Sequence, residues 1–359
     1  MWVTIPIVTR DNAVLIGIVT HILRVSLLLN GRVSMSHLHR LYLGTIGEGL
    51  WRSLDSGETF TRDYNGLFVE CHIRAMVVQP SDPRTIYLGT ELGLFRSSDG
   101  ASNWSRVDSP INGLQVWSIS ISPHDPNLIV VGTCPSRLFR TEDGGKTWSE
   151  PPVQILRECP RIMHTRVTTI MFDPTEPGMV WAGVEIDALF RSKDYGVTWQ
   201  QFGQGLSSRD IHGLAIVPGN GKPKRMIAST NNDLNVSTDG GETWRPQNIG
   251  KSLPWSYCRG MAQMPGRPET IFLGNGDGPP GTVGMPARST DGGLTWQTAK
   301  MPGRANSTIW NFGVHTSDPN LVYTNSVSGE VYRSTDGGAS FEKLPREFGE
   351  IRQSAWTPA

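Results

Sequence analysis

Arginine, histidine and large aromatic side chains recur at two fixed positions of a repeated strand pattern in this 359-residue chain. The repeated strands alternate in polarity and usually end at a proline, as in residues 73–80 and 116–123. Aligned on that proline, one position holds His72, Gln115, Arg166, Asp210, Tyr257, Thr308 and Glu350. The position two residues further on holds Arg74, Trp117, Thr168, His212, Arg259, Trp310 and Arg352. Because strand side chains alternate, both positions face the same side and converge if the strands surround an axis.

These residue types are suited to a small anionic ligand. Arginine presents a planar fork for a carboxylate or phosphate, and aromatic rings stack on a ring or sugar face. Histidine acts as a general acid or base near neutrality. The expected binding residues are Arg74, Arg166, Arg259, Arg352, Trp117 and Trp310, and the expected catalytic residues are His72, His212, Asp210, Glu350 and Tyr257. We therefore predict a hydrolase or lyase acting on a small anionic, carboxylate-bearing or sugar-like substrate in a central pocket.

Other interpretations of the same positions stay open. One is a self-satisfied polar plug, in which Asp210 and Glu350 pair with neighbouring arginines and water satisfies the rest. A register shift of one residue would also turn all these side chains away from the axis. The acids that follow the second strands could rim the same mouth, although each alone is interpreted as a solvated loop charge: Glu48, Glu91, Glu185, Asp187, Asp277 and Glu330.

No metal and no cofactor are expected. The histidines that ring strands could bring together, His72, His164, His212 and His315, have no metal-ligand spacing in the sequence. Nothing resembles a phosphate-cradling loop, a nucleophile elbow or a dinucleotide fingerprint.

A nine-residue motif, illustrated by residues 236–244 (VSTDGGETW), occurs seven times. Its aspartates are Asp55, Asp99, Asp143, Asp194, Asp239, Asp291 and Asp336. The carboxylate can accept N–H groups of a tight turn, and the glycine after it tolerates positive φ. The closing tryptophan or phenylalanine can be buried between sheets. The motif is therefore predicted to be a structural hairpin corner and not a catalytic site.

The motif is one part of a longer repeat, which predicts the fold. A strand ending in glycine, such as residues 86–89 (IYLG), precedes most copies, and the proline-ended strand precedes that. With the strand after the motif this makes four strands per repeat, which is typical of a propeller blade. The first repeat has no inner strand of its own, and residues 351–358 supply one. We predict an all-β chain with an N-terminal extension (1–38) and a single seven-bladed β-propeller (39–359) closed by the C-terminal strand.

The segments that depart from the repeat indicate which face is functional. Residues 149–165 lengthen one connection between blades, and residues 275–286 lengthen one connection within a blade. Both are expected on the face opposite the nine-residue motifs, where functional loops would lie.

The nine-residue motif resembles the BNR or Asp-box repeat, S-x-D-x-G-x-T-W, over about residues 41–358. The family includes sialidases, sortilin-type receptors, xyloglucan-cleaving glycosidases and photosystem II assembly factors. The resemblance implies the propeller fold, whereas unrelated activities share that fold. The alternative to an enzyme is a non-enzymatic protein-binding or assembly scaffold.

The family's catalytic residues are not carried over to this chain. The sialidase F/Y-R-I-P motif is missing before the first box, and the seven repeats differ from the six blades of sialidases. Xyloglucan-cleaving relatives carry two propellers, whereas this chain is long enough for one.

The composition argues against several classes of partner. The 33 basic and 33 acidic residues balance, so neither nucleic acid nor a membrane is an expected partner. Four cysteines without paired spacing indicate reduced thiols, and a cytoplasmic location is expected. Residues 13–29 are apolar but contain His21 and Arg24, which argues against a membrane anchor, and no small-residue cleavage site supports a signal peptide.

Overall fold

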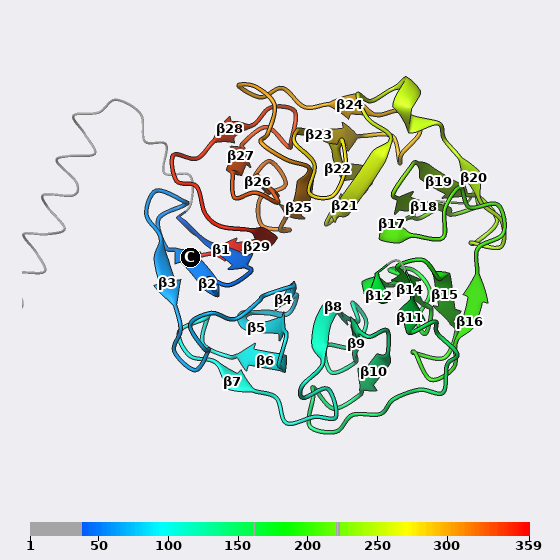
Figure 1. Cartoon of the computed structure of the whole chain (residues 1–359), viewed down its shortest axis with the longest axis horizontal. Helices are drawn as coiled ribbons and strands as arrows, with labels where there is room; N and C mark the ends of the chain where they lie inside the picture. The colour runs from blue at the N-terminus through cyan, green and yellow to red at the C-terminus, as the bar shows by residue number, and fades with distance from the viewer. Residues whose placement is uncertain (1–37, 161, 220, 222) are drawn as a thin grey trace, which may run out of the picture. The chain divides into compact units, whose positions relative to one another are not determined.

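The computed structural model describes residues 38–160, 162–219, 221 and 223–359. In this part of the chain, seven β-sheets are arranged as blades around a central axis (Figure 1). The protein is a seven-bladed β-propeller, as predicted from the repeats. The expected N-terminal extension lies outside the described residues apart from Leu38, and the propeller unit runs from His39 to Ala359.

Each blade is an antiparallel sheet with one edge at the axis. From blade 1 to blade 7, the inner strands are β29 (Ile351–Pro358), β4 (Ala75–Gln79), β8 (Gln115–Ile121), β13 (Val167–Phe172), β17 (Ile211–Val217), β21 (Tyr257–Met264) and β25 (Ile309–Gly313). The second strands are β1 (His39–Thr45), β5 (Asp82–Thr90), β9 (Ile129–Cys134), β14 (Val180–Val184), β18 (Arg225–Thr230), β22 (Arg267–Gly276) and β26 (Val322–Ser326). The third strands are β2 (Leu50–Ser53), β6 (Gly93–Ser97), β10 (Leu138–Thr141), β15 (Ala188–Ser192), β19 (Leu234–Ser237), β23 (Gly284–Ser289) and β27 (Val331–Ser334).

The outer strands are short. They are β3 (Thr61–Asp63), β7 (Ser105–Arg106), β16 (Gln200–Phe202), β20 (Arg245–Pro246), β24 (Gln297–Thr298) and β28 (Glu342–Lys343). The connections contain the small hairpin of β11 (Glu158–Cys159) and β12 (Met163–His164) and the 3-10 turn η1 (Ile249–Lys251). No helix in the described residues is long and apolar enough to cross a membrane.

Blade 3 departs from the predicted four strands. Its sheet contains only β8, β9 and β10 among the described residues. A single bridge between Arg140 and Ser149 stands where the fourth strand would pair. Pro151 and Pro152 follow after Glu150, and because proline has no N–H to donate, the strand cannot continue. The chain leaves the blade there and enters the β11–β12 connection.

The propeller is closed by the C-terminal strand, as predicted. β29 pairs antiparallel with β1, from Pro358 opposite His39 to Ile351 opposite Thr45. Blade 1 therefore combines β29 with β1, β2 and β3, the first three strands of the described residues (Figure 1). This pairing covers the two sheet edges that an open ring would expose.

The hydrophobic core lies between neighbouring blades. Between blades 4 and 5, for example, Trp181, Leu189 and Ile211 pack together and are at most 1% exposed. Burial of one aliphatic side chain contributes about 1.5 to 3 kcal/mol. Because every inner strand contacts the inner strands on both sides, the residues that face the axis are held on a rigid frame.

The nine-residue motifs form tight corners with a common set of hydrogen bonds. In blade 5, the Ser237 hydroxyl donates to Oδ1 of Asp239 at 2.7 Å and accepts the N–H of Gly241 at 2.8 Å. The Thr243 hydroxyl donates to Oδ2 of the same aspartate at 2.5 Å. Gly241 has φ of 87°, and a Cβ there would lie 2.3 Å from the Trp181 ring. The motif therefore joins two blades and has a structural role.

Candidate functional site

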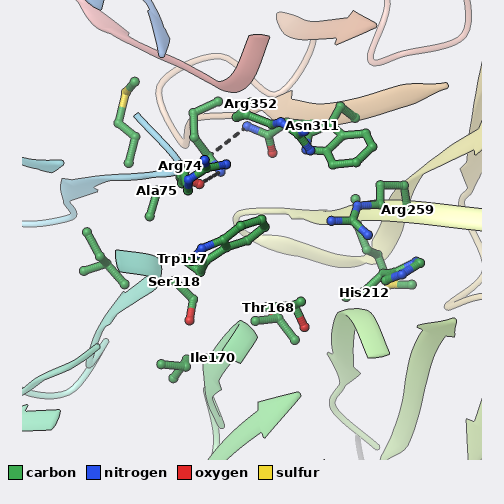
Figure 2. A pocket seen from close by; sticks show the side chains of 18 residues that line it. Arg74, Ala75, Trp117, Ser118, Thr168, Ile170, His212, Arg259, Asn311 and Arg352 are labelled. Atoms are coloured by element: carbon green, nitrogen blue, oxygen red, sulfur yellow. Dashed lines mark hydrogen bonds between the residues drawn. The ribbon is translucent and has the colours of Figure 1, made fainter. Parts of the chain in front are cut away.

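Two adjoining cavities occupy the centre of the propeller. The larger, about 960 Å³, and the smaller, about 280 Å³, share six lining residues: Arg74, Trp117, His212, Arg259, Trp310 and Arg352. All six were expected at the second of the two ring positions. Figure 2 shows side chains of this group reaching into one space from different blades. The inner strands thus bring together residues that lie far apart in the sequence.

The remaining expected residues lie mostly in the larger cavity. Arg166, Asp210, Tyr257 and Glu350 line it, beside Gln115. Tyr257 is buried, which raises its pKa, and its ring centroid lies 5.4 Å from that of His212.

His72 lines neither cavity. Its backbone N–H donates to Glu91, and the adjacent Ile73 N–H donates to Thr45 of blade 1. The backbone at His72 thus belongs to the crossing between blades 1 and 2, before β4 begins. This position does not support the catalytic role expected of His72.

Each tryptophan at the axis is flanked by two arginines. The guanidinium carbons of Arg74 and Arg166 lie 4.8 and 4.6 Å from the ring centroid of Trp117. A guanidinium at this distance is attracted to the quadrupole of the indole ring, so the contact orients both arginines.

The same arrangement recurs around the second tryptophan. The guanidinium carbons of Arg259 and Arg352 lie 4.1 and 4.2 Å from the ring centroid of Trp310. All four expected arginines are therefore held by aromatic contacts at the wall of the cavity.

Two of the four arginines are paired with glutamates. Nη1 of Arg166 lies 2.8 and 2.6 Å from the two carboxylate oxygens of Glu185. Arg352 forms an ion pair with Glu350. Burial lowers the pKa of Arg352 to about 10, although Glu350 opposes the shift. The polar-plug interpretation is correct for Glu350, which does pair with an arginine.

The other two arginines have no carboxylate within 4.0 Å among the described residues. Nε of Arg74 is buried and has no hydrogen-bond partner in that part of the chain. Burial lowers the pKa of Arg74, against the more distant Glu350. Arg259 contacts Trp310 and lies near the Tyr257 hydroxyl. Two cationic groups are therefore available to an anion.

Asp210 and His212 lie side by side with no proton to form a hydrogen bond between them. Nδ1 of His212 lies 2.7 Å from the Cys258 carbonyl oxygen, and its Nε2 lies 3.4 Å from Oδ1 of Asp210. A carbonyl only accepts, so Nδ1 carries the proton and Nε2 of a neutral ring is an acceptor. It faces another acceptor, because Oδ1 has no hydrogen-bond donor among the described residues. One added proton would join the two atoms.

Burial controls the charge of this pair. It is the largest cause of the lowered pKa of His212, and Arg259 adds to it. Burial raises the pKa of Asp210, but Arg259 and Arg166, together with His212 whenever its ring is protonated, outweigh burial and the net pKa is lowered. A neutral imidazole beside an ionised carboxylate is the state of a proton acceptor. The Asp210 side chain is 19% exposed and that of His212 is 2% exposed, so a proton enters through Asp210.

The pKa of Glu185 is shifted in the opposite direction to that of Asp210. Burial raises its pKa, and the neighbouring Asp210 adds to this, while Arg166 opposes it. Glu185 and Asp210 line the same cavity. Two nearby carboxyl groups whose pKa values move apart are suited to the roles of acid and base.

The interpretation of some rim acids as solvated loop charges is wrong. Glu185, Asp187 and Glu330 are each 8% exposed. Asp187 accepts the Leu156 N–H at 2.8 Å, and Glu330 pairs with Lys343 at 2.6 Å. These partners come from other segments, so no local sequence pattern indicates them.

The two long connections do reach the cavity. Residues 162–164 and 277–280 line it, together with Cys134 and Asn231. Both connections were predicted to be functional loops because they depart from the repeat, although their individual contacts could not be predicted. Within the described ranges no three His, Cys, Asp or Glu side chains are grouped to hold a metal ion.

Comparison with known proteins finds the same repeat in this chain. The model of the BNR/Asp-box repeat matches residues 236–246, the motif whose corner is described above. The chain is a BNR/Asp-box repeat β-propeller. This propeller is 27% identical over 277 residues to a probable oligoxyloglucan-reducing end-specific xyloglucanase of Neosartorya fischeri, covering 71% of this chain and 31% of that protein. It is 24% identical over 308 residues to sortilin of Rattus norvegicus, covering 82% and 32%.

Solved structures share the fold of the BNR/Asp-box propeller. A GH74 xyloglucanase from Xanthomonas campestris matches with a TM-score of 0.61 at 18% identity, over 85% of this chain and 52% of that chain. YCF48 bound to D1 peptide matches with a TM-score of 0.50 at 18% identity, over 76% and 81%. The chain spans about a third of the length of the xyloglucanase and sortilin relatives.

Proposed function

We propose that this propeller is a hydrolase or lyase that binds a small anionic or sugar-like substrate in the central cavity. The observation that carries the proposal is the position of the Asp210–His212 pair. This proton acceptor lies on the wall of the same cavity that holds four arginines and two tryptophans. Anion-binding groups and an acid–base group therefore converge on one space.

The division of roles follows from the charges. Arg74 and Arg259 bind the anionic group of the substrate, and the rings of Trp117 and Trp310 stack on its body. Asp210, supported by the imidazole next to it, takes a proton from a water molecule in hydrolysis or from a carbon in elimination.

Glu185 is the complementary acid. Its raised pKa means that Glu185 takes up a proton at a higher pH than an ordinary carboxyl, and in that protonated form, released from its ion pair with Arg166, it can donate to the departing oxygen. In hydrolysis the water supplies OH to one product while the leaving oxygen receives the proton of Glu185. The proton held at Asp210 then returns to Glu185 through solvent, so the enzyme ends in its starting state.

The relatives support a sugar-like substrate without naming it. Several of the matching proteins are described as xyloglucanases. The proposal takes the sugar-like body from this similarity and the anionic group from the four arginines of the cavity.

The test is turnover of a panel of glycosides by the full chain. The panel contains carboxylate-bearing glycosides and their neutral counterparts, and the readouts are release of the leaving group and formation of an unsaturated product. Turnover is expected for the carboxylate-bearing members. Asp210→Asn and Glu185→Gln should each lower kcat by about 10²- to 10⁴-fold. Glu58→Gln is the matched control because the Glu58 side chain is 65% exposed.

Binding without turnover of any panel member would overturn the enzymatic proposal. Turnover that persists in both carboxylate variants would overturn the assigned roles. Binding is measured separately by titration calorimetry, so loss of chemistry is distinguished from loss of the ligand.

A non-enzymatic binding protein is the second candidate. The observation that favours it is an apolar side chain at the cavity rim, Met163, which is 73% exposed. An exposed methionine beside a large opening is suited to contact with a peptide or protein. Peptide binding by the wild-type chain that is lost in Met163→Ser would support this candidate.

A further inference from the structure

The arginines and tryptophans at the axis form two matching sets. The first set runs through blades 2, 3 and 4 as Arg74, Trp117 and Arg166, and the second through blades 6, 7 and 1 as Arg259, Trp310 and Arg352. In both sets a tryptophan contacts an arginine from each neighbouring blade. We call them the first and second Arg–Trp–Arg sets.

The match extends to the charges. In each set the third residue is paired with a glutamate, Arg166 with Glu185 and Arg352 with Glu350. In each set the first residue is an arginine that has no carboxylate within 4.0 Å in the described part of the chain. Each set therefore presents one unneutralised guanidinium to the cavity.

The two unneutralised arginines come from separate sides of the cavity. Arg74 lies just before β4 of blade 2 and Arg259 in β21 of blade 6, and both residues line both cavities. Figure 2 shows the two side chains reaching into the pocket from different directions, with Trp117 near Arg74 and His212 near Arg259. A single carboxylate bound to one of these arginines leaves the other without an anionic partner.

We propose that the ligand of this cavity carries two anionic groups, one for Arg74 and one for Arg259, with an intervening body that contacts the rings of Trp117 and Trp310. The inference rests on the proposed function for the location of the site. It specifies the substrate class as a dicarboxylate or an equivalent dianion.

A dianionic ligand is favoured because a desolvated charge without a partner costs free energy. Nε of Arg74 is buried and unsatisfied among the described residues. A buried cation that lacks an anion is destabilising, whereas a fork-shaped contact with a carboxylate provides two charge-assisted hydrogen bonds. A dianion satisfies both sets at once, and its second contact adds affinity without a second loss of translational freedom.

The test compares matched dicarboxylates and monocarboxylates by titration calorimetry on the full chain. The probes are the linear dicarboxylates from succinate to suberate, terephthalate and isophthalate, and the monocarboxylate of the same carbon skeleton for each. At one spacing the dicarboxylate should bind about 10- to 100-fold more tightly than its monocarboxylate, the gain expected for one more charge-assisted contact. Equal affinities at every spacing would overturn the inference.

Two variants test the assignment of each group. Arg74→Ala and Arg259→Ala should each reduce the dicarboxylate's affinity to that of the monocarboxylate, and the double variant should bind neither probe. Arg84→Ala is the control, because the Arg84 side chain is 71% exposed and its carboxylate contact is Asp82 at 3.6 Å. Thermal melting of each variant verifies folding.

The pattern of failure separates this inference from the proposed function. If both kinds of probe bind equally and both are lost in Arg259→Ala, the anion site stands and the two-group inference is wrong. If no member of the series binds the wild-type chain, the inference is wrong, and the glycoside turnover assay decides the proposed function independently.

Discussion

The ring of Trp356, near the end of the chain, lies 5.4 Å from the ring of His39, the first residue of β1. Nε2 of His39 in turn lies 2.6 Å from the Tyr323 hydroxyl of blade 7. These contacts join the last strand, the first strand and the last blade. The closure of the ring is therefore a packed aromatic junction as well as a row of backbone hydrogen bonds.

Loss of this junction should destabilise the whole propeller. Trp356 is 3% exposed, so Trp356→Ala should lower the free energy of unfolding by about 3 to 5 kcal/mol through lost burial and a residual cavity. Urea denaturation measures the change. Leu294→Ala is the control, because Leu294 is 61% exposed and its truncation should change stability by less than about 0.5 kcal/mol.

Deletion of residues 349–359 is the stronger form of the same test. It removes β29, so β1 loses its inner partner and both edges of the ring are uncovered. A cooperative thermal transition should disappear. A truncated chain that melts within a few degrees of the intact one would show that closure contributes little.

The serine of the nine-residue motif in blade 5 should contribute more to stability than its exposed neighbour Thr238. Ser237 is 1% exposed, and its hydroxyl both donates to Asp239 and accepts the Gly241 N–H. Ser237→Ala leaves that N–H unsatisfied and should cost about 1 to 3 kcal/mol of stability. Thr238→Ala, at the adjacent exposed position, is the matched control and should be nearly neutral. Equal unfolding midpoints for the two variants would contradict the structural role of the motif.

The fold could be predicted because its signals are local. The nine-residue motif recurs at a regular period, and the alternation counted back from each proline sets the direction of Arg74 or Arg352. His72 is the exception, because it lines neither cavity although Arg74, two residues further on, lines both. Pro151 shows a second limit, because it ends blade 3 although the repeat continues around it.

The pairing of charges in the site could not be predicted, because it depends on contacts between segments. Glu185 reaches Arg166 only once β13 and β14 have paired. The tautomer of His212 is set by a carbonyl oxygen of the next blade, that of Cys258. Neither partner has a sequence pattern of its own. Alternation predicts which side chains face the axis, and tertiary packing decides which of them remain charged and unpaired.

Two adjacent glycines should respond differently to the same substitution. Gly240 and Gly241 both have positive φ, 76° and 87°. A Cβ at Gly240 meets nothing within 4 Å, whereas one at Gly241 would lie 2.3 Å from the buried ring of Trp181. Gly240→Ala should therefore cost about 1 to 2 kcal/mol through left-handed strain alone. Gly241→Ala should cost about 1 to 3 kcal/mol more, because the ring must move within a packed interface. Chemical denaturation of both variants measures the difference, and equal losses would contradict the close packing of blades 4 and 5.

Acidification should destabilise the propeller through His212. Burial holds its pKa below the ordinary value of 6.5, so just below pH 6.5 the unfolded chain binds a proton there that the folded chain does not. The contribution of neutral His212 to the unfolding free energy is therefore fully present above about pH 6.5. It falls as the pH drops toward the folded pKa, with a slope of up to about 1.4 kcal/mol per pH unit. The ionised Asp210 beside it opposes this loss, and Arg259 reinforces it.

The contribution of this histidine can be isolated by comparing variants between pH 7.5 and 5.5, above the range in which ordinary carboxylates titrate. His212→Gln should show a smaller loss of unfolding free energy than the wild-type chain over this interval, because glutamine does not titrate. His124→Gln is the control, since His124 is exposed and lies outside the cavity. If the wild-type chain and His212→Gln lose stability in parallel, the pKa of His212 is the same in the folded and unfolded chains, which contradicts the prediction. If the wild-type chain loses less stability than the variant, the imidazole is already protonated in the folded state at neutral pH. Asp210 would then hold its proton bond before substrate arrives, and its role as the proton acceptor would pass to another group.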